Sequence, residues 1–146
     1  MRAIFKEYYR SLHRVLKSEG KSKYSVSIGR DIGERLFPND ITDLDGFVKG
    51  IRHILAKHLR MADTIEMTRD GENLYLRIMA CALCPLNSEL CKSGVEAGCI
   101  VPGILLFSLR KTFEKNFWVS AKVVKFKKTD VGDCDWVFYV KLEPRR

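Results

Sequence analysis

The chain has 146 residues, which is the length of one typical domain. Apolar residues make up 46% and charged residues 30%, a composition that excludes a disordered chain. The longest uncharged run, 97–109, is interrupted by Pro102 and is too short for a spanning helix, which needs about 20 apolar residues. The first ten residues also hold no apolar stretch of signal-peptide length. We therefore expect one domain over 1–146, with no membrane span and a cytoplasmic location.

The charge of the chain is positive. It has 26 Lys and Arg against 18 Asp and Glu, a formal net charge of +8. This excess is typical of proteins that bind nucleic acid or an acidic surface, and it equally suits a soluble protein of another function. Composition therefore leaves a binding module, an enzyme and a nucleic-acid binder all open.

Helical spacing of apolar residues predicts two helices at the start of the chain, Ile4–Leu16 and Tyr24–Leu36. The second contains Gly29 and Gly33. Glycine is unfavourable in a helix interior by about 1 kcal/mol, so this pair predicts the close approach of another backbone.

The third predicted helix, Asp43–Leu59, has the clearest apolar face, and Thr42 is its expected N-cap. His53 and His58 are five residues apart on it. That spacing is about 140° around an α-helix, so we do not expect them to share a face or a metal ion.

After residue 63 the period of the apolar residues changes to two. Two alternating segments flank Asp70-Gly71, which is the strongest short hairpin signal. A turn at these two residues pairs Met67 with Leu74 and Ile65 with Leu76. All four side chains then lie on one face of the hairpin.

The last third of the chain predicts an apolar helix, Ile100–Phe113, and two strands, Trp118–Lys128 and Asp135–Glu143. The alternation in the first of these strands slips after Val123, which predicts a β-bulge. The fold class is therefore α+β. We expect an antiparallel sheet of about four strands in two hairpins, covered on one face by helices, with the N-terminal helices first.

Cysteine is the most informative residue type. The five cysteines are Cys81, Cys84, Cys91, Cys99 and Cys134. Their odd number and the expected reducing compartment argue against a disulfide framework. Two thiolates at C-x2-C spacing can reach one ion from a tight turn, and two more complete a tetrahedral zinc site. We expect four of the five to bind zinc, with an iron–sulfur cluster or metal-free redox thiols as alternatives.

Known catalytic motifs are not found. The sequence has no G-x-S-x-G, no H-E-x-x-H, no Rossmann glycines and no flavin fingerprint. We therefore expect a protein that is not an enzyme.

Three segments carry a resemblance to a known family: SIGRDIGERL at 27–36, GCIVPGILLFSL at 98–109, and VSAKVVKF followed by GDCDWVFYV near the C-terminus. In this order the chain resembles the 4-vinyl reductase domain family of small-molecule or hydrocarbon-binding domains. The resemblance spans nearly the whole chain. It implies a fold related to subunits of vesicle-tethering complexes and to NO-sensing haem domains, and a homodimer formed through the N-terminal helices.

The resemblance also implies a site. Some related regulators bind a ligand between helices and sheet and hold zinc nearby, at positions that match Cys99 and Cys134. The acidic ligand and the further cysteine of that pattern are absent from the terminal hairpin here. Cys81, Cys84 or Cys91 must then replace them, so that zinc holds the long loop.

The expected function is that of a sensor or carrier domain for a small apolar ligand, with a cysteine-bound zinc ion. Apolar side chains of the third helix and of the first hairpin are expected to line its cavity: Phe47, Ile51, Leu55, Leu74, Leu76 and Ile78. One alternative is a redox sensor in which Cys81, Cys84 and Cys91 form reversible disulfides. Another is an adaptor that binds protein or nucleic acid through a basic face formed by Lys122, Lys125, Lys127 and Lys128.

Overall fold

The computed structural model describes residues 24–85, 99–129 and 131–146. The predicted helix Ile4–Leu16 and Cys91 lie outside these ranges. The homodimer expected through the N-terminal helices therefore stays a prediction.

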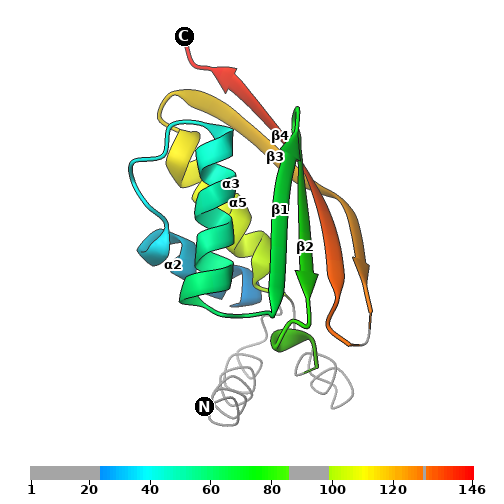
Figure 1. The fold of residues 1–146 in the computed structure, drawn as a ribbon. Coiled ribbons are helices and arrows are strands. Elements are labelled where there is room, and N and C mark those ends of the chain that lie inside the picture. The colour runs from blue at the N-terminus through cyan, green and yellow to red at the C-terminus, as the bar shows by residue number, and fades with distance from the viewer. Residues whose placement is uncertain (1–23, 86–98, 130) are drawn as a thin grey trace.

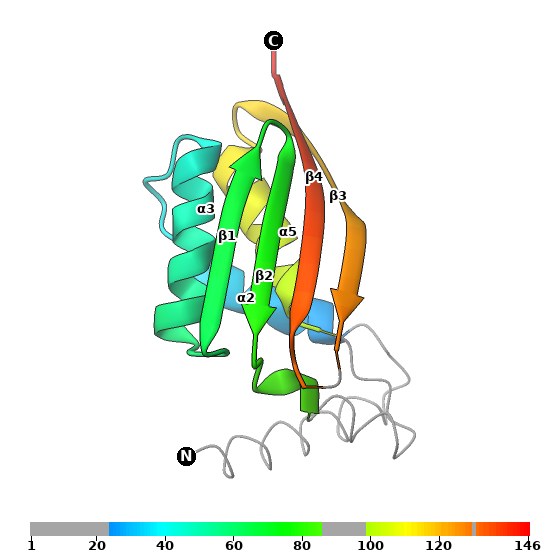
Figure 2. The same cartoon turned by 45° about the vertical axis from the view of Figure 1, so that its right-hand side comes forward.

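One open antiparallel sheet carries the helices on one of its faces (Figures 1 and 2). Its strands are β1 (Thr64–Asp70), β2 (Asn73–Met79), β3 (Phe117–Lys128) and β4 (Cys134–Pro144), in the order β1-β2-β4-β3. The described helices are α2 (Tyr24–Leu36), α3 (Leu44–His53), the π-helical turn η1 (Ile54–His58) and α5 (Val101–Phe113). The predicted α+β class is confirmed. Within the described ranges, no helix is both long enough and apolar enough to cross a membrane.

The first hairpin has the predicted inner face but a different register. Its two-residue turn consists of Gly71 and Glu72, one residue later than expected, and Met67 pairs with Leu76 instead of Leu74. Gly71 has a φ of 61°, which suits the first central position of a type II′ turn. Every pair therefore moves by two residues, an even shift that leaves the apolar side chains on the same face.

The glycines of α2 allow this helix to pack closely on α5, as their spacing predicts. A Cβ at Gly29 would lie 2.5 Å from the Ile100 carbonyl oxygen, and one at Gly33 would lie 2.7 Å from Ser108 Oγ. No larger residue fits at Gly29 without movement of backbone, because the neighbouring atom belongs to the main chain. The contact places the start of α5, and with it Cys99, relative to α2.

Helix α3 departs from the prediction at both ends. Asp43 is the N-cap in place of Thr42, because its carboxylate accepts a hydrogen bond from Gly46 N at 2.7 Å. At the other end, η1 continues the helix with the wider π-type bond from Leu59 N to the Ile54 oxygen. This widening brings His53 and His58 together, with ring centroids 5.1 Å apart, although regular α-helical geometry separates them.

The predicted β-bulge of β3 is present. Register shifts between Val123 and Lys125, so that Val124 has no partner in β4. Lys122 and Lys125 consequently lie on the same face of the sheet, although an odd spacing in a regular strand would place them on opposite faces.

Candidate functional site

Four of the five cysteines converge at one end of the sheet. Cys81 and Cys84 follow β2, Cys99 precedes α5, and Cys134 begins β4. All four line one cavity of about 260 Å³. Its other walls are mainly apolar and consist of Ile78, Val101, Pro102, Phe126, Lys128 and Trp136.

Backbone contacts fix Cys81 beside the loop that leads to Cys134. Cys81 N donates a hydrogen bond to the Gly132 oxygen at 2.9 Å, and Ala80 N donates to Asp133 Oδ1 at 2.9 Å. Gly132 has a φ of 90°, and a Cβ there would lie 2.9 Å from the Cys81 carbonyl oxygen. Position 132 therefore requires glycine, both for its backbone conformation and for the space it leaves.

Cys81 and Cys84 form a hydrogen-bonded pair of thiols. The Cys84 S–H group donates to Cys81, and this bond lowers the pKa of Cys81 although burial opposes it. The backbone N–H groups of Leu83 and Cys84 act in the same direction. The same contact, together with burial, raises the pKa of Cys84. Cys81 is therefore the more nucleophilic member of the pair.

The other two cysteines favour the neutral thiol. Burial raises the pKa of Cys99 to about 12, and the nearby Lys128 opposes it only weakly. Burial also raises the pKa of Cys134, while the Trp136 indole favours the thiolate. Trp136 Nε1–H is buried and forms no hydrogen bond of regular geometry among the described residues, although it lies near enough to Cys134 to favour its thiolate. The cavity thus combines one activated thiol with three thiols that favour the neutral form.

The four cysteines are suitable ligands for zinc, but the positions of their side chains do not form a zinc site. Four thiols are a complete tetrahedral set for a borderline-soft ion. Across 24–85, 99–129 and 131–146, however, no three His, Cys, Asp or Glu side chains lie close enough together to hold a metal ion. The four cysteines therefore share a cavity without forming a closed coordination sphere.

The residues expected to line a ligand pocket lie in the core, and their role in binding a ligand stays a prediction. All six residues predicted to line it are at most 1% exposed and pack together in the core between helices and sheet. Ile78 reaches the cysteine cavity, and Leu76 reaches a second cavity associated with the opposite face of the sheet. Three further cavity residues were not predicted from the sequence: Phe126, Lys128 and Trp136. The alternation along β3 and β4 indicates on which face of the sheet these three residues lie. The β-bulge and the strand order are also needed to predict that they share one cavity.

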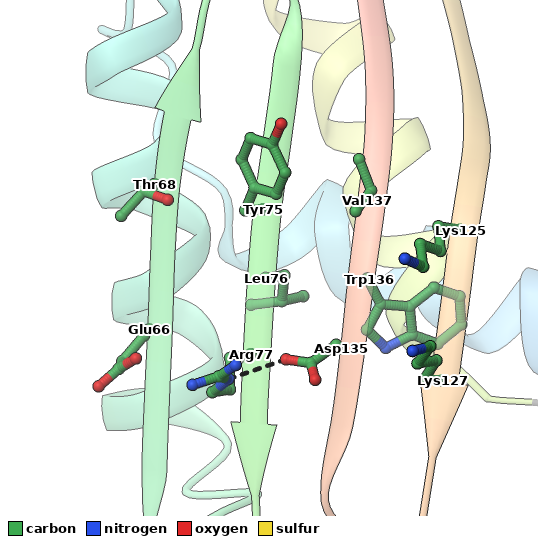
Figure 3. A pocket seen from close by; sticks show the side chains of 10 residues that line it. All are labelled: Glu66, Thr68, Tyr75, Leu76, Arg77, Lys125, Lys127, Asp135, Trp136 and Val137. Atoms are coloured by element: carbon green, nitrogen blue, oxygen red, sulfur yellow. Dashed lines mark hydrogen bonds and ion pairs between the residues drawn. The ribbon is translucent and has the colours of Figure 1, made fainter.

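The second cavity has a volume of about 450 Å³ and is shown in Figure 3. Tyr75 and Val137 lie in its middle, and Lys125 and Lys127 lie on the β3 side. An ion pair between Arg77 Nε and Asp135 Oδ1, at 2.9 Å, crosses from β2 to β4. The pair also raises the pKa of Arg77, chiefly through the hydrogen bond to Asp135.

Comparison with known proteins identifies a fold but not a family. No family model matches the chain, and no curated protein matches it. A solved structure that does match is the trafficking protein particle complex subunit 3 from Naegleria fowleri, covalently bound to palmitic acid. It superposes with a TM-score of 0.55 and 13% identity, over 99% of this chain and 98% of that chain. The chain therefore shares its fold with this complex subunit, and the 4-vinyl reductase assignment stays a prediction.

Proposed function

We propose that the chain is a ligand-binding domain whose cysteine cavity holds a zinc ion through Cys81, Cys84, Cys99 and Cys134. The observation that carries the proposal is the convergence of these four thiols, from three separate segments, on one cavity. Buried cysteines scattered through a core would serve packing alone. Because these four cysteines share a cavity, we infer that their side chains move to bring the sulfur atoms to one ion.

Zinc supplies a cross-link between the ends of β2, β4 and α5. Its ligands are thiolates, so binding releases the protons of the three neutral thiols and becomes tighter as the pH rises. Lys128 stands at the cavity wall, where its charge favours the Cys99 thiolate. Bound zinc would take Cys81 and Cys84 as ligands and so replace the hydrogen bond between them.

Metal analysis of the protein purified without a tag tests this role. We expect about one zinc per chain, and loss of it when any of the four cavity cysteines is changed to serine. Cys91→Ser is the matched control, because it removes the one cysteine that is not assigned to the site. Zinc absent from the native protein, or lost only in Cys91→Ser, would overturn the assignment.

The apolar walls of the same cavity support a small apolar ligand. The cysteines are bordered by Ile78, Val101, Pro102 and the aromatic pair Phe126–Trp136. The two rings of this pair are tilted by 32° with centroids 4.0 Å apart. A neighbour in fold carries a palmitoyl group, so a fatty acid is a rational first probe. We infer binding without turnover.

Titration with palmitate, followed by the fluorescence of Trp136 in a Trp118→Phe background, tests this ligand class. Saturable quenching should be weakened by Phe126→Ala and unaffected by Val124→Ala, a nearby exposed residue outside the cavity. Equal effects of the two changes, or no saturation, would exclude this cavity as the binding site.

A redox switch is a second candidate, favoured by the hydrogen bond between Cys84 and Cys81. With glutathione disulfide as oxidant, the Cys81 thiolate attacks one sulfur and releases one glutathione thiolate. Cys84 then loses its proton, attacks the mixed disulfide and releases the second. Two protein thiols are oxidised and one disulfide is reduced. Mass spectrometry that finds a Cys81–Cys84 bond in metal-free protein, reversed by dithiothreitol, would support this function. Free thiols at saturating oxidant would exclude it.

A further inference from the structure

The outer face of the sheet, defined as the face opposite the helices, carries side chains that the proposed function does not use. Figure 2 shows the helices behind the sheet, so that in the described part of the chain no element covers this face. Neighbouring strands pair in register across it. The row Thr68–Tyr75–Val137–Lys125 runs from β1 to β3, next to the row Glu66–Arg77–Asp135–Lys127.

Three aromatic side chains lie on the outer face, one on each of three strands. Tyr75 on β2 is 41% exposed and Trp118 on β3 is 58% exposed. Tyr139 on β4 lies between them, in the row next to that of Tyr75 and opposite Lys122. The three rings therefore form a diagonal track across the sheet. Tyr75 and the half-buried Tyr139 lie on the central strands β2 and β4, whereas Trp118 lies on the edge strand β3, where the Arg145 guanidinium covers its ring at 3.8 Å from the centroid. An exposed ring such as that of Tyr75 offers a flat surface on which a planar group can stack.

Three lysines flank this track on one side. Lys122, Lys125 and Lys127 pair with Tyr139, Val137 and Asp135, and the bulge at Val124 keeps all three on the outer face. Lys125 and Lys127 are spaced about 7 Å apart along the strand. Figure 3 shows them on one side of the cavity, with Glu66 and Thr68 on the other.

The charges of these lysines are available to a ligand. Asp135, which lies opposite Lys127 in the sheet, is already paired with Arg77. The described residues form no ion pair with Lys122, Lys125 or Lys127. Lys122 Nζ lies over the Tyr139 ring, 5.8 Å from its centroid, in a cation–π contact.

We propose that the outer face of the sheet binds single-stranded nucleic acid. Unpaired bases stack on Tyr75 and Tyr139, while the phosphates follow the lysines of β3. Single-stranded nucleic acid matches both the aromatic rings and the lysines, because its flat bases alternate with negatively charged phosphates. A duplex keeps its bases paired and offers the rings nothing to stack on. An acidic peptide matches the lysines only. The surface lies on the face opposite the helices, so the proposal does not depend on zinc or on a ligand in the cysteine cavity.

Fluorescence anisotropy with a labelled 12-nucleotide oligo(U) tests the proposal on the intact chain. We expect affinity to fall with rising salt, and the triple change Lys122→Gln, Lys125→Gln and Lys127→Gln to reduce the log–log slope by about 2, at about 0.7 per phosphate contact. The control triple Lys49→Gln, Lys57→Gln and Lys115→Gln removes the same charge from exposed positions elsewhere and should leave the slope close to that of the native protein.

Stacking is tested by changing the rings. Tyr75→Ala should weaken oligo(U) binding roughly tenfold, whereas Tyr75→Phe, which keeps the ring, should retain it. Thermal unfolding of both variants confirms that they are folded. The proposal is overturned by absence of binding at low salt, by equal losses in the two lysine triples, or by equal affinity of Tyr75→Ala and Tyr75→Phe. Binding of oligoglutamate as tight as that of oligo(U) would assign the surface to acidic peptides instead.

Discussion

Gly132 lies against Cys81 so closely that a Cβ would come within 2.9 Å of the Cys81 carbonyl oxygen and 3.0 Å of its nitrogen. Gly132→Ala should therefore lower the free energy of unfolding by about 2–4 kcal/mol, from steric overlap and left-handed strain together. Gly71→Ala is the matched control. Its φ of 61° carries the strain, but no atom lies within 4 Å of the added carbon, so we expect a loss of about 1 kcal/mol. Urea unfolding measures both, and equal losses would contradict the close contact.

The two glycines of α2 should differ in tolerance. Alanine at Gly29 meets backbone atoms of Ile100 and Ile104, so Gly29→Ala should destabilise the protein by about 2–3 kcal/mol. Alanine at Gly33 meets the side-chain oxygen of Ser108, which can rotate. Gly33→Ala should therefore be the milder change in the same unfolding experiment, and the reverse order would contradict the packing of α2 on α5.

Ser108 carries a buried hydroxyl that has no hydrogen-bond partner among the described residues, and the residue is fully buried. Ser108→Ala removes an unsatisfied polar atom and should leave stability unchanged or raise it by up to about 1 kcal/mol. In the Ser108→Ala background, Gly33→Ala should lower the free energy of unfolding by less than in the native protein, because Ser108 Oγ is no longer present. A double-mutant cycle with additive effects would show that the two positions do not interact.

Thiol reactivity in metal-free protein should depend on pH in a way set by Cys84. The lowered pKa of Cys81 keeps it a thiolate at a pH where an ordinary cysteine, with a pKa of about 8.5, is protonated. Alkylation by iodoacetamide should thus be fastest at Cys81 and persist below neutral pH. Cys84→Ser replaces the donating thiol by a hydroxyl, which can still donate a hydrogen bond, so Cys84→Ala is the better test. Cys84→Ala should shift the pH dependence of Cys81 alkylation to higher pH. Peptide mapping that finds Cys99 or Cys134 alkylated first would contradict the assignment, since burial raises the pKa of both.

Local signals in the sequence predicted the elements well. Helix α2 has the predicted bounds, and the bulge of β3 lies where the alternation slips. The hairpin register was wrong by two residues, because Asp70-Gly71 and Gly71-Glu72 turns both keep the apolar side chains inward. The N-cap and the π-turn of α3 also escaped prediction, since Thr42 and Asp43 are both good caps and a regular helix is the default expectation.

The candidate site required knowledge that no local pattern carries. The C-x2-C pair and Cys99 are close in sequence, and their grouping was predicted. Cys134 joins them only because β4 pairs with β2 in the order β1-β2-β4-β3, which places it opposite Ile78. The six expected pocket residues were chosen from their apolar faces, which serve a packed core equally well, and the structure places them in that core.

Cobalt substitution tests the central claim most directly. Co²⁺ added to the metal-free, reduced protein reports coordination number and ligand type through its absorption spectrum. Four cavity thiolates predict an intense visible band of tetrahedral Co²⁺ and a thiolate-to-cobalt charge-transfer band, both saturating at one equivalent and retained in Cys91→Ser. A weak spectrum of octahedral Co²⁺ without the charge-transfer band would contradict a zinc site built from Cys81, Cys84, Cys99 and Cys134.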